Sequence, residues 1–116
     1  MLSSSSSRRR SPADLLQRIL QNTAHDKLVF LIFSGAGCYV CSKLRQHLPW
    51  FADTYRHQID VVLVDARKYS HLATEYGVHT IPTVMVYKRG IRMLKETGIG
   101  SRERLQEMLQ MAIQAA

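Results

Sequence analysis

The sequence contains few cysteines, and it has no long apolar run. Its only two cysteines, Cys38 and Cys41, lie three positions apart. No cysteine is therefore left for a disulfide between distant parts of the chain, which excludes a small secreted scaffold and favours an intracellular or organellar redox setting. No apolar run approaches the roughly 20 residues of a membrane-spanning helix, so we expect neither an integral membrane protein nor a membrane partner. A single globular domain suits the length of 116 residues.

Acidic residues are also scarce, and the chain carries a formal net charge of +7. Three of the positive charges are consecutive, Arg8 to Arg10, and the others are scattered along the chain. Aromatic residues are not interleaved with them as in a nucleic-acid-binding face, so we do not expect a nucleic-acid partner. A solvated basic surface is the simpler interpretation, and it would attract acidic partners.

The first segment, residues 1–11, has no acidic residue and is rich in Ser and Arg. Such a segment buries too little apolar surface to offset its ordering entropy, so we expect it to be disordered. Its composition is typical of an organellar transit segment, which predicts the mitochondrial matrix as the location. The alternative is an ordinary terminus of a cytoplasmic protein. The folded domain is expected over residues 12–116.

Apolar periodicity and turn residues predict alternating helices and strands. Gly77 is expected to end the third helix, Arg89-Gly90 to form a tight turn, and Pro49 to kink the second helix. Strands separated by helices predict parallel pairing, and the last hairpin adds an antiparallel edge. This gives an α/β fold with helices on both faces of a sheet of about four strands. The expected helices cover residues 12–23, 38–55, 70–76 and a stretch after Ser101, and the expected strands cover 28–33, 59–65, 82–87 and 92–97.

The chain is organised around residues 29–41, VFLIFSGAGCYVC. An uncharged apolar run fits a strand buried on both faces, and the glycines allow a sharp turn after it. A helix that starts near Cys38 directs its free N–H groups and its positive dipole end at that sulfur. This favours the thiolate, which is the nucleophile in disulfide exchange. The spacing also allows Cys41 to close a disulfide with Cys38, so this stretch predicts a redox-active dithiol.

Three features together resemble the thioredoxin family over roughly residues 13–113. They are the CxxC after a buried strand, the stretch YGVHTIPT at residues 76–83, and a strand hairpin that ends in Gly98 before a final helix. The resemblance implies a thioredoxin-like three-layer α/β/α fold with a mixed central sheet. It also implies that Cys38 is the nucleophile, that Cys41 resolves the mixed disulfide, and that Pro82 is cis and lies against the dithiol. Residues expected to contact substrate are Gly37, Tyr39, Ile81, Pro82 and Gly98.

The chain departs from the family at the dithiol. The aromatic residue that usually precedes the first cysteine is replaced by Gly37, and Tyr39 is a partial substitute. The family's buried acid corresponds to Ile32, and the lysine that pairs with this acid corresponds to Val61. Without a base nearby, we expect slower deprotonation of Cys41 at neutral pH. The family's first strand also has no counterpart in residues 1–11.

Three functions follow from this reading. The first is a thiol–disulfide oxidoreductase that reduces protein disulfides with Cys38 and Cys41, binds no cofactor, and receives electrons from a partner reductase or a small thiol. The second is a thioredoxin-like binding or assembly subunit of an organellar complex with weak redox activity. The third is a metal site, which would need ligands from a second chain because one CxxC supplies only two of four. We therefore expect no metal site. We also expect the protein to be a monomer.

Overall fold

The computed structural model describes residues 12–22 and 27–115, and the predictions for residues 1–11 lie outside these ranges. The predicted elements are all present, with ends that differ by at most one residue. The helices are α1 (Pro12–Asn22), α2 (Tyr39–Thr54), α3 (Ser70–Glu75) and α4 (Arg102–Gln114). The strands are β2 (Leu28–Ser34), β3 (Ile59–Asp65), β4 (Thr83–Lys88) and β5 (Ile91–Thr97).

The four strands form one mixed sheet in the order β3-β2-β4-β5. β2 pairs with β3 in parallel and with β4 in antiparallel, and β4 pairs with β5 in antiparallel. The predicted parallel crossover between β3 and β4 is therefore wrong. The reason is the length of α3, which has 6 residues and so spans about 9 Å, whereas a strand of 7 residues such as β3 spans about 23 Å. A helix this short cannot carry the chain back along the strand.

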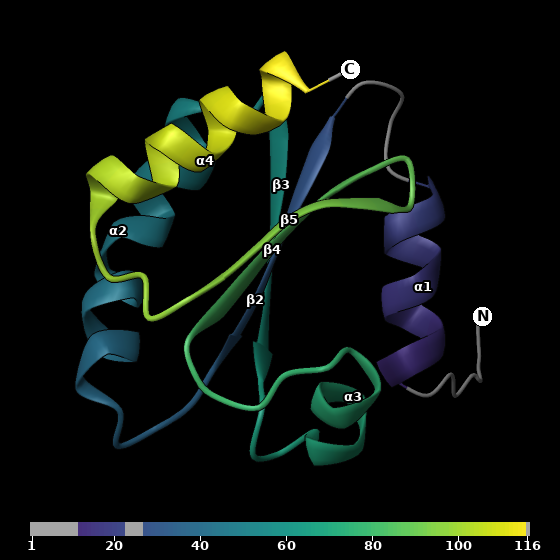
Figure 1. Ribbon diagram of the computed structural model, residues 1–116, viewed down its shortest axis with the longest axis vertical. Coiled ribbons are helices and arrows are strands. Elements are labelled where there is room, and N and C mark those ends of the chain that lie inside the picture. Colours follow the sequence, from purple (N-terminus) through teal and green to yellow (C-terminus); the bar gives the residue numbers. More distant parts are fainter. Residues whose placement is uncertain (1–11, 23–26, 116) are drawn as a thin grey trace, which may run out of the picture.

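The helices cover both faces of the sheet, as predicted. Figure 1 shows α2 and α4 on one side and α1 and α3 on the other, with the strands between them. β2 alternates between the two layers, because Phe30 and Ile32 face α2 and α4 whereas Leu31 and Phe33 face α1 and α3. All seven residues of β2 are buried. The sheet is therefore held firmly at the strand that leads to the dithiol.

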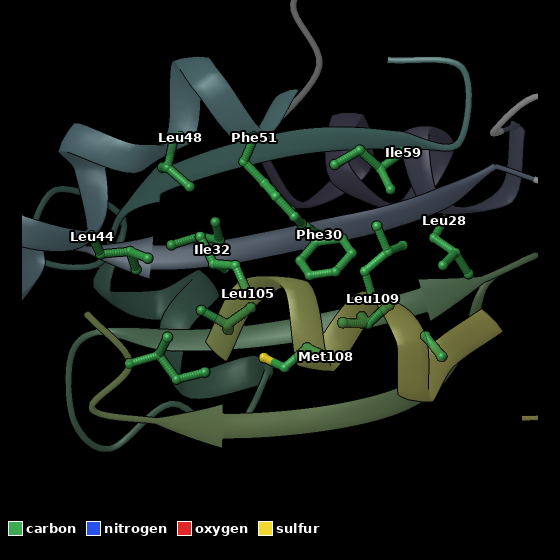
Figure 2. Close-up of a cluster of buried hydrophobic side chains, with 14 residues drawn as sticks. Leu28, Phe30, Ile32, Leu44, Leu48, Phe51, Ile59, Leu105, Met108 and Leu109 are labelled. Carbon is green, nitrogen blue, oxygen red and sulfur yellow. The ribbon is translucent and has the colours of Figure 1, made fainter. Parts of the chain in front are cut away.

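The helix that carries the cysteines is anchored on this sheet through aromatic and leucine side chains. Phe51 of α2 contacts Phe30 of β2 edge to face, with ring centroids 4.9 Å apart, and Figure 2 shows Leu44 and Leu48 on the same side of the helix. Pro49 lies inside α2, which continues to Thr54. On this helix Cys41 is fully buried, whereas Val40 is only half-buried.

Two predicted turns are confirmed by their backbone geometry. Gly77 has a φ of 71°, which ends α3 in the left-handed region. Arg89 and Gly90 have φ values of 53° and 81°, as a tight turn between paired strands requires. None of the helices in the described ranges is long and apolar enough to cross a membrane.

Candidate active site

The loop after β2 brings the backbone close to a second segment of the chain. A Cβ added to Gly35 would lie 2.8 Å from the Cδ1 atom of Ile81, so a larger residue would displace the Ile81 side chain. Gly37 has a φ of 73°, which favours glycine directly before the first cysteine. The two glycines therefore allow residues 35–37 to turn sharply beside Ile81.

Cys38 is the N-cap residue of α2. Its extended backbone lets its sulfur accept the N–H of Cys41 at 3.3 Å, at the point where the helix leaves N–H groups without partners. Hydrogen bonding from Cys41 lowers the pKa of Cys38 most, and the positive charges of Arg67 and Arg45 lower it further, against the opposing effect of burial. The sequence-based expectation of a thiolate-favouring helix start is therefore met by this geometry.

Cys41 is fully buried one turn further along α2. Burial raises the pKa of Cys41 most, and its hydrogen bond to Cys38 raises it too, whereas the Ser34 side chain and the Gly35 backbone lower it by hydrogen bonding. The two sulfurs thus differ in kind, because Cys38 favours the thiolate and Cys41 keeps its proton. Such a division suits a nucleophile followed by a resolving thiol.

The Ile81–Pro82 peptide lies beside Cys38, as the family resemblance implies. The bond is cis, and the carbonyl oxygen of Ile81 lies 3.9 Å from the Cys38 sulfur. Gly98, which directly follows β5, lies at the same place, because its N–H donates to the Pro82 carbonyl at 2.9 Å. Gly98 has a φ of 75°, and no heavy atom lies within 4 Å of where a Cβ would stand. The structure therefore brings together Cys38, Ile81, Pro82 and Gly98.

Tyr39 stands at the surface beside these residues. Its side chain is 75% exposed, and its ring lies 5.4 Å from the Lys43 ammonium. It is therefore open to a partner molecule.

Apolar side chains occupy the two positions at which the family has a buried acid and its paired lysine. Ile32 is fully buried in the centre of β2, and Val61 is half-buried on β3. Asp65 accepts the backbone N–H groups of Arg67 and Lys68, so it caps the loop that follows β3. The His79 side chain is exposed to solvent. Within the described residues, no group of three or more His, Cys, Asp or Glu side chains could hold a metal ion.

Three residues near the dithiol were missed by the sequence reasoning. Arg45 donates to the Ser34 hydroxyl at 2.7 Å and to the Gly35 carbonyl at 3.2 Å, and Arg67 donates to the Ala36 carbonyl. A signal for two of them was present, because Ser34 is the polar end of an apolar strand and Arg45 lies one helical turn after Cys41. Nothing in the sequence indicated Arg67.

The fold and the dithiol define a class of proteins that carry a CxxC on a strand–turn–helix beside a cis-proline. A thioredoxin family model matches residues 12–111. The chain therefore belongs to the thioredoxin family, a family of thiol–disulfide oxidoreductases.

Individual relatives agree with this assignment. A thioredoxin-like protein from Synechocystis is 29% identical over 75% of this chain and 83% of its own length, and the thioredoxin of Porphyra purpurea is 30% identical over 77% and 78%. Other relatives include chloroplastic thioredoxins of Arabidopsis thaliana. Among solved structures, the germline-specific thioredoxin Deadhead from Drosophila melanogaster superposes with a TM-score of 0.74 at 26% identity, covering 91% of this chain and 96% of that one.

Proposed function

We propose that the protein reduces disulfide bonds of other proteins. The observation that supports this most is the unequal pair of thiols, with a half-exposed Cys38 at the helix start and a buried Cys41 beside it. The Cys38 thiolate attacks one sulfur of a substrate disulfide, which forms a mixed disulfide and releases the other sulfur as a thiolate. Cys41 then loses its proton and attacks the Cys38 sulfur, so that the Cys38–Cys41 disulfide forms and the second substrate thiolate leaves. Two electrons pass from the protein to the substrate.

A substrate chain would bind along the rim formed by Ile81, Pro82 and Gly98. The Ile81 backbone and the open space above Gly98 allow an extended peptide to approach Cys38. The positive charges of Arg67 and Arg45 act on the nucleophile, so we expect disulfides flanked by acidic residues to react faster than those flanked by basic ones. A partner reductase or a small thiol returns the protein to its reduced form, and the protein acts without a bound cofactor.

Turnover of a protein disulfide tests this function. Reduced insulin precipitates, so its formation is followed by turbidity with dithiothreitol as the electron donor. We expect wild-type protein to accelerate precipitation and Cys38→Ser to give only the background rate. Equal rates for the two proteins would refute the function. Arg56→Gln, an exposed change two residues beyond the end of α2, serves as a control that keeps the wild-type rate.

A second candidate is a binding or assembly subunit of an organellar complex with weak redox activity. The apolar Ile32 at the family's acid position favours it, because this side chain cannot receive a proton from Cys41. The two functions differ in the insulin assay and in complex formation. A subunit would co-migrate with its complex on size-exclusion chromatography of an extract, and Cys38→Ser would leave that co-migration unchanged.

The mitochondrial location remains a prediction from the composition of residues 1–11. The relatives named above include cyanobacterial and chloroplastic proteins, so they give this location no support. Fusion of residues 1–20 to a fluorescent reporter tests it. Import into mitochondria is the expected result, and a diffuse cytosolic signal would remove the prediction.

A further inference from the structure

The resolving step needs a negative charge on a buried sulfur. Cys41 is fully buried, and burial disfavours the charged form of a thiol. The family position for a buried acid holds Ile32, which offers neither a proton acceptor nor a hydrogen-bond donor. Some other group must make the Cys41 thiolate accessible if the protein turns over.

A pair of polar side chains lies beside Cys41 at the end of β2. Ser34 is only 3% exposed and is the last residue of a strand that is otherwise apolar. Arg45 follows Cys41 by one helical turn, so its side chain starts from the same side of α2. Its guanidinium reaches the sheet and donates to the Ser34 hydroxyl at 2.7 Å and to the Gly35 carbonyl at 3.2 Å. The two bonds fix the position of Arg45 against the strand end.

The chemistry of the two groups determines the direction of their hydrogen bonds. A guanidinium is a donor only, so the Ser34 oxygen accepts in the bond with Arg45. The Ser34 proton is then left for another acceptor, and hydrogen bonding by the Ser34 side chain lowers the pKa of Cys41. A donor fixed by a charged partner makes a stronger bond to an anion than a freely rotating hydroxyl does.

Water has access to this pair. An open cavity of about 470 Å³ is lined by Ser34, Gly35 and Arg45 together with residues of β3 and the loop that follows it. The ionisable groups around the pair are Cys38 on the same helix, Arg67 in the loop after β3, and the cavity residues Asp65, Lys68 and Tyr69. The pKa of Asp65 is lowered by the backbone N–H groups that it accepts, so this carboxylate stays ionised and is a poor base at neutral pH. The cavity therefore brings solvent to the end of β2, next to Ser34 and Arg45.

We propose that Ser34 and Arg45 form a donor pair that stabilises the Cys41 thiolate during the resolving step, in place of the proton-accepting acid of the family. This rests on the proposed disulfide reductase function. In this proposal Ser34 donates to the Cys41 sulfur, and Arg45 is a positioning residue that acts through Ser34. In the step itself, Cys41 gives its proton to water and its sulfur bonds to Cys38, while the Cys38–substrate bond breaks and the substrate leaves as a thiolate.

The ionisation of Cys41 is the first test, and it needs no turnover. In full-length Cys38→Ser protein, Cys41 is the sole thiol, and the ¹³C shift of its β-carbon reports its titration. Adding Ser34→Ala or Arg45→Gln is expected to raise the pKa of Cys41 by about one unit, whereas adding Arg56→Gln leaves it unchanged. Arg45→Lys keeps a charged donor and is expected to have a smaller effect than Arg45→Gln. Far-UV circular dichroism checks that each variant is folded.

The kinetics of single turnover are the second test. A peptide disulfide with a fluorophore on one half and a quencher on the other reports formation of the mixed disulfide, and liquid chromatography of acid-quenched samples reports its decay. Ser34→Ala is expected to slow the decay roughly tenfold at pH 7 and to change formation little. The difference in decay rate between Ser34→Ala and the wild type should shrink as the pH rises, because hydroxide then deprotonates Cys41 without help from Ser34.

The outcomes separate the two proposals. If Ser34→Ala changes neither the pKa of Cys41 nor the decay rate while Cys38→Ser abolishes turnover, the donor pair has no role and the reductase function stands. If Arg45→Gln acts but Ser34→Ala does not, the route through Ser34 is wrong. If Cys38→Ser turns over insulin like the wild type, the reductase function itself fails.

Discussion

Replacement of Phe51 by leucine tests how firmly α2 is held on the sheet. The Phe51 side chain is fully buried, with ring centroids 4.9 Å from Phe30 and 5.4 Å from Tyr55. Leucine keeps most of the apolar volume but loses both edge-to-face contacts, each worth about 0.5–1.5 kcal/mol beyond burial. Imperfect repacking adds up to about 1.5 kcal/mol. We therefore expect the free energy of unfolding to fall by roughly 2 kcal/mol.

Urea unfolding followed by far-UV circular dichroism measures this loss. The expected change is a large part of the roughly 5–15 kcal/mol that stabilises a domain. Ile91→Ala is the control, because this side chain on β5 is 66% exposed, and its loss should cost under about 0.5 kcal/mol. Equal costs for the two variants would refute the assignment of Phe51 to the core. Alkylation of Cys38 at pH 7 should change little in Phe51→Leu, because the Cys38 sulfur is held by the first turn of α2.

Three further variants test single contacts. Arg67→Gln removes a positive charge that lowers the pKa of Cys38, so this pKa should rise and the thiolate should be lost at a higher pH than in the wild type. Alkylation of Cys38 by iodoacetamide at pH 7 should therefore slow a few-fold, whereas the rate in strongly alkaline buffer should match that of the wild type. Gly98→Val places a branched residue at a φ of 75°, which should lower the free energy of unfolding in urea by about 1–2 kcal/mol. The same variant should slow the reduction of insulin more than the reduction of a small disulfide. Equal slowing of the two reactions would refute a substrate-contacting role for Gly98. Arg104→Met removes hydrogen bonds to Glu96 and Glu107, and the free energy of unfolding should fall only modestly because this ion pair is half-exposed. A loss above roughly 2 kcal/mol would contradict this expectation.

The elements and the dithiol were predictable because they depend on local pattern. Local sequence determines the backbone conformation of the apolar run before Ser34, of Gly77 and of the turn at Arg89-Gly90. The cis bond before Pro82 was predictable only through the family resemblance, since the residues alone also allow a trans proline at the start of a strand.

Features that depend on contacts between distant segments were not predictable in the same way. The direction of β4 depends on the length of α3, which is a matter of tertiary geometry rather than of periodicity. The contact of Arg45 with Ser34 joins a helix to a strand end, and that of Arg67 with Ala36 joins two loops. Long polar side chains reach several positions, so the sequence does not indicate which carbonyl or hydroxyl they find.

The two helical layers are unequal, and this affects how the protein opens. α4 buries Leu105, Met108, Leu109 and Ala112 almost completely, whereas α1 buries Leu16 and Leu20. Amide hydrogens of α1 should therefore exchange with deuterium earlier than those of α2 and α4, because local opening starts where little apolar surface is covered. The cysteines belong to the layer of α2 and α4, whose amide hydrogens should exchange slowly. A reaction cycle can therefore proceed while the opposite layer opens locally.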